Sequence, residues 1–417
     1  MIKVANISKI SAFKTYGESM FPLLWDGDVV YLAKKRFDRI AVNDIVCVRK
    51  GLPAGRQGDR IFTHRVVYKT DKYLITKGEN NQTSDGKIYP KNVIGVVYKI
   101  KRGRNEFSID DLYLIQSTLY FGEIVKVKRT LEKTGIKFVF LKGLPLHLYH
   151  EGKHPRRIYA DCDILISPKF FSRAKTILRK LGFKEFDSSL SETLGRLKNK
   201  SPEVNFLKIV KGFPIFFDIH LEVVFMMTQL GELNALYPQS LLNSLSGKFL
   251  REKRDVSVWS HKFPILSSEN LLIYLALHLY HHNFKGAYRY DFMKSIISKE
   301  QQNFSKIAKL AKEYKLMNFI YPVFLILQKY YGLNFDRDFL NDIRPDSSFA
   351  RVRKMLYKLN IFDEEQRINS GIERFKNLFY LSPEPFFRKV MVFLDKQVIY
   401  TIIWVFLNRV KSIKMVR

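Results

Sequence analysis

A serine and a histidine 45 positions apart are the first residues in this sequence whose types could do chemistry together. Ser19 lies in the short segment GESMFP, between Gly17 and Pro22, and His64 lies in IFTHRVVYK, a run with strand-like composition. A serine hydroxyl is a weak nucleophile at neutral pH and needs a base within hydrogen-bond distance. Histidine, with an unperturbed pKa near ~6.5, can be that base with little adjustment. Taken alone, Ser19 is better explained as a serine in a turn, and His64 as a strand histidine without a catalytic partner.

Three aspartates form a second candidate site. Asp161 and Asp163 alternate in YADCDILI, so in a strand their side chains share one face, roughly 6.5 to 7 Å apart. Asp218, in FFDIHLEV, offers a third carboxylate on another predicted strand. Neighbouring carboxylates repel one another and need cations, for which Mg²⁺ ions bridging nucleotide phosphates are the usual solution. For an isolated Asp-x-Asp, the alternative is an exposed strand edge.

The composition indicates a folded protein with a strongly basic surface. The chain has 417 residues, enough for two or three domains, and its 46% hydrophobic and 27% charged residues are typical of globular proteins. Only two cysteines occur, Cys47 and Cys162, which argues against a disulfide framework and fits a reducing compartment. The formal net charge of +31 favours contact with phosphates, nucleic acid or anionic lipid, although solubility alone explains it equally well.

No segment predicts a membrane-spanning helix. The first residues are polar and mixed, unlike a signal peptide, and no stretch approaches the ~18 to 20 apolar residues that span a bilayer. Residues 398–407, which lie between Lys396 and Arg409, are expected to form a buried helix, with a membrane-interface position as the alternative. We therefore expect a cytoplasmic protein, with peripheral contact to an anionic membrane left open.

Strand and helix patterns predict a multidomain chain with three regions. Residues 1–103 contain short apolar runs separated by Gly, Asn and Asp turns, which predicts an all-β domain. Residues 104–262 alternate between helix and strand patterns, which predicts an α/β domain whose first helix begins after Ser108. Residues 263–417 show helical patterns alone, the last at 384–407 with Pro385 at its first helical position.

The ordered motifs of the first region resemble the signal peptidase I family, specifically its endoplasmic-reticulum and archaeal type. The motifs are Ser-Met-x-Pro, Gly-Asp, Asn-Asp-Ile-Val, His-Arg-Val and Thr-Lys-Gly followed by an aspartate, and they stand at residues 19–22, 27–28, 43–46, 64–66, 76–81 and 85. The resemblance implies the β fold shared with LexA-type repressors. It also implies a serine endopeptidase with Ser19 as nucleophile, His64 as general base, Asp85 orienting the imidazole, and no cofactor.

Two departures from that family bear on the substrate, which the resemblance makes a peptide or preprotein. Glu79 stands where the family usually has aspartate. Only 18 residues precede Ser19, so we expect no N-terminal membrane anchor. An intracellular peptide, or recruitment to a membrane by a partner, then becomes a better expectation than secretory preprotein processing.

The second region resembles the uncharacterised nucleotidyltransferase family with a DNA polymerase β-like fold, over about residues 110–400. The resemblance rests on LKG, RRIYADCDILI, LGF and FFDIHLEV. It implies that Asp161 and Asp163 hold Mg²⁺ with Asp218 as the third acid. The residues implied to approach the phosphates of a nucleoside triphosphate are Lys142, Gly143 and Arg157. Better-known polymerase β-like enzymes carry Gly-Ser at the loop, where this chain has Lys-Gly.

Together these patterns predict a serine-type peptidase fused to a Mg²⁺-dependent nucleotidyltransferase-like domain with a helical C-terminal region. The alternative is a regulatory or nucleic-acid-binding protein in which one or both sites are inactive. His278, His281 and His282 have a spacing that could bind a metal, but packed helix residues explain them better.

Overall fold

The first part of the chain forms an eight-stranded sheet in the order β1-β2-β7-β3-β4-β5-β6, with β8 paired to β7. The computed structural model describes residues 12–51, 59–81, 83–159, 162–185, 202–223, 225–227, 233–345, 349–362, 367–396 and 398–400. All pairs in this sheet are antiparallel, as expected for short strands joined by tight turns. The strands are β1 (Ala12–Lys14), β2 (Val29–Ala33), β3 (Ile45–Gly51), β4 (Asp59–Lys69), β5 (Leu74–Lys77), β6 (Lys87–Ile88), β7 (Val93–Arg102) and β8 (Asn105–Ser108).

One long helix, α1 (Ile109–Lys133), connects this sheet to the second domain. It begins where the sequence predicted, because the Ser108 side chain accepts a hydrogen bond from the Asp111 amide and the Asp111 side chain accepts one from the Ser108 amide, both at 3.0 Å. Its first turns bury Leu112 and Tyr113 in the same core cluster as Met20. The first sheet, with β8, thus extends to Ser108, past the predicted boundary at residue 103, and shares α1 with the next domain.

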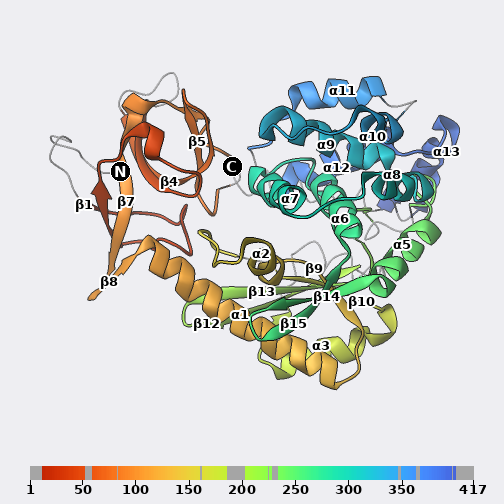
Figure 1. Cartoon of the computed structure of the whole chain (residues 1–417), viewed down its shortest axis with the longest axis horizontal. Coiled ribbons are helices and arrows are strands. Elements are labelled where there is room, and N and C mark those ends of the chain that lie inside the picture. The colour runs from red at the N-terminus through yellow and green to blue at the C-terminus, as the bar shows by residue number, and fades with distance from the viewer. Residues whose placement is uncertain are drawn as a thin grey trace.

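The second domain is a seven-stranded mixed sheet in the order β11-β12-β13-β10-β9-β15-β14. β10 is parallel to β13, and β15 is parallel to β9, while the other pairs are antiparallel. In the view of Figure 1, α1 and α3 lie below this sheet and α6 and α7 lie above it. The elements are β9 (Phe138–Lys142), α2 (Leu144–Glu151), β10 (Asp163–Ile166), α3 (Phe171–Lys180), β11 (Lys184–Glu185), β12 (Glu203–Val210), β13 (Phe213–His220), α5 (Gln239–Arg251), β14 (Lys253–Val258) and β15 (His261–Leu266).

The third region is helical and packs around α6, in which every residue from Asn270 to Tyr280 is buried. A helix that is apolar on all sides is stable only when other elements surround it, and α8 and α9 do so here. Tyr68 of β4 also meets Phe362, with ring centroids 4.6 Å apart, so the first sheet touches this region. The helices are α6 (Ser268–His281), α7 (Ala287–Lys299), α8 (Phe304–Glu313), α9 (Met317–Tyr331), α10 (Arg337–Asp342), α11 (Phe349–Lys358), α12 (Arg367–Leu381) and α13 (Phe386–Val390).

The single helix predicted at residues 384–407 is wrong for its described part. Pro385 is the N-cap of α13 rather than its first helical residue, and α13 ends at Val390. A separate 3₁₀ turn, Met391–Leu394, follows it. None of the helices in the described ranges combines the length and the apolar character needed to cross a bilayer.

The shared core predicts a contrast between two leucines of α1. Leu112 is 2% exposed in the core of the first sheet, whereas Leu114 on the same helix is 48% exposed. We expect Leu112→Ala to lower the free energy of unfolding by about 2 to 5 kcal/mol, because it removes buried methyl groups and leaves a cavity. Leu114→Ala is the matched control and should change it by less than about 0.5 kcal/mol. Urea unfolding measures both, and equal effects would contradict the shared core.

Candidate functional site

Ser19, His64 and Asp85 lie in one hydrogen-bonded row. The Ser19 hydroxyl oxygen is 3.1 Å from His64 Nε2, and His64 Nδ1 is 2.7 Å from an Asp85 carboxylate oxygen. His64 is 1% exposed in the middle of β4, while Ser19 precedes β2 and Asp85 follows β5. The sequence separates the serine and the histidine by 45 positions, and the antiparallel sheet brings them together.

The acidic end of this row is held by a residue that the sequence reasoning did not single out. Thr76 of β5 donates a hydrogen bond from its hydroxyl to the same Asp85 oxygen, at 2.7 Å. The Asp85 amide in turn donates to the Thr76 carbonyl, at 2.8 Å. With two donors on one oxygen, the carboxylate faces His64 Nδ1 in a fixed orientation. Thr76 begins the Thr-Lys-Gly motif, so its place in that motif was the available signal.

The serine end is held by its backbone. The Asn80 amide donates to the Ser19 carbonyl at 2.9 Å, and a Cβ on Gly78 would lie only 2.6 Å from that same carbonyl oxygen. Only glycine therefore fits at position 78 without moving the turn. Met20 and Leu23, which follow the serine, are buried in the sheet core. The loop at residues 78–81 and the core together fix the position of the hydroxyl.

A buried arginine connects this row to the second domain. Arg65 follows His64 on β4 and pairs with Glu79, the residue that departs from the signal peptidase pattern. It also donates to the backbone carbonyl of Arg156 at 2.8 Å, and its guanidinium lies 5.3 Å from the centroid of the Tyr113 ring. Two of these partners belong to α1 and to the loop after α2. The second domain therefore supports the loop that holds Ser19.

The second candidate site lies where β9, β10 and β13 run side by side. Asp163 on β10 is in register with Lys142 on β9 and with Asp218 on β13. One Asp163 oxygen is 2.6 Å from His220 Nε2, and the other is 3.2 Å from the Lys142 amine. The sequence-predicted residues Lys142, Asp163 and Asp218 are thus brought together. Asp161 lies outside the described residues.

The charge state of His220 follows from its neighbours. Burial alone would lower its pKa, but the carboxylates of Glu203 and Asp163 outweigh burial and raise the pKa above its usual value. His220 Nδ1 lies 3.7 Å from Glu203, on the side away from Asp163. The two carboxylates on either side of His220 thus favour its protonated form.

The residues present fit a divalent cation in type. The second oxygen of Asp163 is buried and accepts no well-aligned hydrogen bond, although the Lys142 amine is near it. Asp218 supplies a neighbouring carboxylate on the adjacent parallel strand. Within the ranges that the structure describes, which omit Asp161, no group of three or more His, Cys, Asp or Glu residues could hold a metal. The described pair would therefore need a further ligand to complete a metal site.

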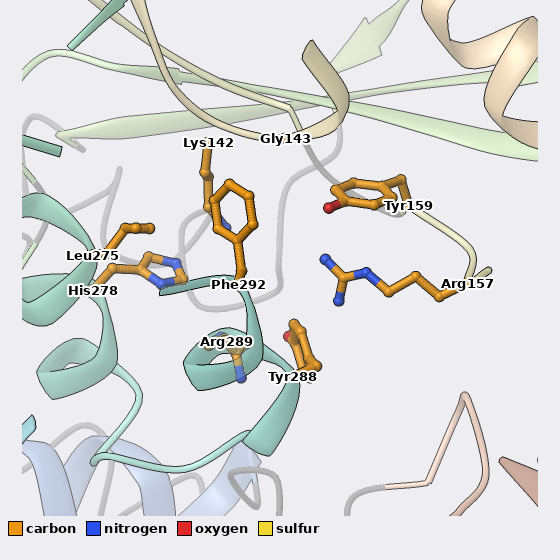
Figure 2. Close-up of a pocket in the computed structure, with 9 residues that line it drawn as sticks. All are labelled: Lys142, Gly143, Arg157, Tyr159, Leu275, His278, Tyr288, Arg289 and Phe292. Carbon is orange, nitrogen blue, oxygen red and sulfur yellow. The ribbon is translucent and has the colours of Figure 1, made fainter. Parts of the chain in front are cut away.

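A pocket beside this cluster contains all three residues predicted to approach phosphates. Three cations reach it from different elements: Lys142 from the end of β9, Arg157 from the loop before β10, and Arg289 from α7. Figure 2 shows the Arg157 side chain extending between Tyr159 and Tyr288, whose ring centroids lie 4.3 and 4.8 Å from its guanidinium. The lining residues are Lys142, Gly143, Arg157, Tyr159, Leu275, His278, Tyr288, Arg289 and Phe292. Converging cations of this kind bind phosphate groups.

Gly143 and Arg289 complete the pocket in different ways. Gly143 caps α2 with a φ of 112°, a backbone conformation that favours glycine, and so places the positive end of the helix at the pocket. Arg289 was missed, because AYRYDF reads as ordinary helix and nothing local marks its direction. His278 is buried at the pocket wall, and burial lowers its pKa well below the usual value. It is a neutral wall residue, in line with the packed-helix interpretation.

A mixed sheet with paired carboxylates beside a cationic pocket is typical of proteins that handle nucleotide phosphates. The family described as "Uncharacterised nucleotidyltransferase" matches residues 112–332, more than half of the chain. The chain therefore belongs to this family. The matched range begins inside α1, after the first sheet. No curated protein and no solved structure matches the chain.

Asp291, on α7 next to the pocket, is expected to make stability depend on pH. Loss of hydration raises its pKa from 3.8 to about 6, and Arg157 and Lys294 offset only part of that rise. The unfolded chain thus ionises first, so stability should fall as pH rises from about 4 to about 6 and then stay level.

Replacing this carboxyl with an amide should remove that loss. We expect Asp291→Asn to raise the free energy of unfolding at pH 8 by about 3 kcal/mol and to leave it nearly unchanged at pH 4. Urea unfolding at both pH values measures the difference. Asp71→Asn, at an exposed turn position, is the control and should have no effect at either pH. An Asp291 variant with the wild-type pH profile would contradict the assignment.

Proposed function

We propose that the chain carries two catalytic sites: a serine peptidase site of signal peptidase I type at Ser19, and a Mg²⁺-dependent nucleotidyl-transfer site in the family domain. The observation that carries the first is the row of contacts from the Ser19 hydroxyl through His64 to Asp85, at 3.1 and 2.7 Å. These distances are those required for a histidine base held by a carboxylate. The proposal that the substrate is a peptide rests on the resemblance of the ordered motifs to the signal peptidase I family.

The geometry supports a two-step acyl transfer. His64 Nε2 takes the hydroxyl proton as the Ser19 oxygen attacks the peptide carbonyl, and Asp85 stabilises the imidazolium that forms. We assign the oxyanion hole to backbone amides of the turn that holds Ser19. His64 then gives its proton to the leaving amine. Water hydrolyses the acyl-serine with His64 again acting as base, which restores the free hydroxyl.

The peptidase proposal is tested by labelling with a fluorophosphonate probe, followed by cleavage of a peptide library rich in small residues. We expect one labelled serine, Ser19, and no labelling or cleavage in Ser19→Ala. His64→Gln should slow labelling by at least about 100-fold, because the base is lost. Ser172→Ala, at an exposed position of α3, is the control and should label normally.

Two outcomes distinguish the alternatives for the first site. Wild-type protein that is not labelled by the probe and cleaves no peptide would contradict the peptidase assignment. If the same preparation binds RNA in a salt-sensitive manner, the binding-protein alternative is favoured. Labelling without cleavage of any peptide would keep the activated serine and reject the peptide class.

The second site is supported by the family match and by the pocket. Asp163 and Asp218, with Asp161, would hold Mg²⁺, which would supply charge neutralisation at the α-phosphate of the transferred nucleotidyl group. Lys142, Arg157 and Arg289 would bind the triphosphate of the nucleotide. His220 orients Asp163 through the 2.6 Å contact and keeps one of its oxygens away from the substrate. The chain's own residues thus position the phosphates, in agreement with a reaction that depends on positioning and charge.

Nucleotide binding and transfer can be tested separately. We expect Arg157→Gln and Arg289→Gln each to weaken binding of nucleoside triphosphates by roughly tenfold, because each removes a charged donor to phosphate. Calorimetric titration with ATP, CTP, GTP and UTP measures this, and Lys180→Gln on α3 is the matched control. Asp163→Asn should abolish Mg²⁺-dependent labelling of the chain or of added peptides by α-labelled nucleotide. Triphosphate affinity that is unchanged in both arginine variants would refute the pocket assignment.

A further inference from the structure

The segment that follows α12 presents an unusual number of large apolar side chains to solvent. Phe386, Phe387 and Leu394 are 68, 75 and 67% exposed, and the chain is otherwise folded around well-buried cores. We define the C-terminal apolar patch as the exposed side chains Phe386, Phe387, Val390, Met391, Phe393 and Leu394. Exposed apolar side chains that cluster along one short segment mark a site of interaction with a partner or a membrane.

The patch is held in place by its inner face. Val392, within the same segment, is buried in the main core. The Lys389 amine donates to the Ser382 carbonyl at 2.6 Å, and the Ser382 hydroxyl donates to the Leu236 carbonyl at 2.6 Å. Both side chains are buried. The aromatic rings are therefore presented on an anchored framework, which lowers the entropic cost of binding.

The charge around the patch is positive. Its acidic neighbour Glu384 is buried and paired with Arg388 at 2.8 Å and with Lys315 at 3.2 Å. Arg388 and Lys396 are exposed among the apolar side chains, and Asp395 is half-buried. The face thus combines exposed aromatic rings with two exposed cations, Lys396 and Arg388, the second of which is paired with the buried Glu384.

We propose that the C-terminal apolar patch binds the surface of an anionic phospholipid bilayer. Aromatic and aliphatic side chains enter the headgroup region, and the cations contact anionic headgroups. A second copy of the chain is a poorer occupant, because two molecules of net charge +31 repel one another. This inference is independent of both proposed activities, since none of its residues belongs to either site.

Flotation with vesicles tests the proposal on the full-length chain. The probes are vesicles of phosphatidylcholine alone and of phosphatidylcholine mixed with phosphatidylglycerol. We expect binding to the anionic vesicles that weakens with added salt. The double variant Phe386→Ser, Phe387→Ser should bind at least about tenfold more weakly, because it removes the two most exposed rings of the patch. Tyr357→Ser, at a tyrosine that is 90% exposed elsewhere, is the matched control.

A charge variant and the oligomeric state complete the test. Lys396→Glu should weaken binding to anionic vesicles several-fold without removing any apolar group. The proposal is overturned if wild-type protein binds neither vesicle, if it binds both equally, or if the double variant binds as well as wild type. It is also overturned if light scattering finds a dimer that the double variant dissociates, because a second copy would then occupy the patch.

Discussion

The packing of the first sheet against the second domain depends on the contacts of the buried Arg65 guanidinium. A charged group that is 7% exposed is costly unless hydrogen bonds and opposite charge satisfy it. Glu79 supplies the charge, the Arg156 carbonyl supplies an acceptor, and the Tyr113 ring covers one face. No single domain contains all three. The first sheet can therefore satisfy this arginine only while it stays docked on α1 and the loop after α2.

The geometry at Ser19 follows from that docking. Glu79 belongs to the same loop as Asn80, whose amide binds the Ser19 carbonyl. Its neighbour Gly78 leaves no room for a side chain beside that carbonyl. A loop held at Glu79 by a buried arginine cannot drift away from the serine. The Glu79 carboxylate reaches the Arg65 guanidinium and pairs with it.

At the second site the buried charge is negative, and cationic side chains lie against it. Asp163 is a buried carboxylate that lies 3.2 Å from the Lys142 amine and 2.6 Å from His220 Nε2. The pocket beside it is lined by Lys142, Arg157 and Arg289, which come from three different elements. Converging cations favour the binding of a polyphosphate. Part of the chain's positive charge is therefore concentrated at this pocket, where it can bind phosphate in addition to any effect of the net charge on solubility.

How much of this the sequence could predict depends on the range of the interactions. Strand alternation and the Ser108 cap are local, so α1, β9 and β10 were predicted near their observed positions, and the order of the motifs was enough to nominate Ser19, His64 and Asp85. β12 and β14 were not predicted, because partly exposed strands such as KRDVSV carry a weak pattern. The mostly buried β15 was not predicted either. Arg289 and the Arg65 contacts depend on which distant elements pack together. The end of α13 at Val390 was missed because the four residues that follow, MVFL, are all apolar, and periodicity cannot place a turn in such a run.

The alternating side-chain directions of β4 explain how this strand serves both the serine site and the junction with the second domain. Successive side chains of a strand face opposite ways, so His64 can serve the serine while Arg65 serves the junction with the second domain. A shift of one residue in the pairing of β4 with β3 and β5 would exchange the two faces and destroy both arrangements together. On the far side of the junction, Arg156 gives its carbonyl to Arg65 while the next residue, Arg157, lines the phosphate pocket. The hydrogen bond from Arg65 to the Arg156 carbonyl thus connects the neighbour of the proposed base, His64, to the neighbour of Arg157 in the proposed phosphate site. The register of β4 maintains both arrangements.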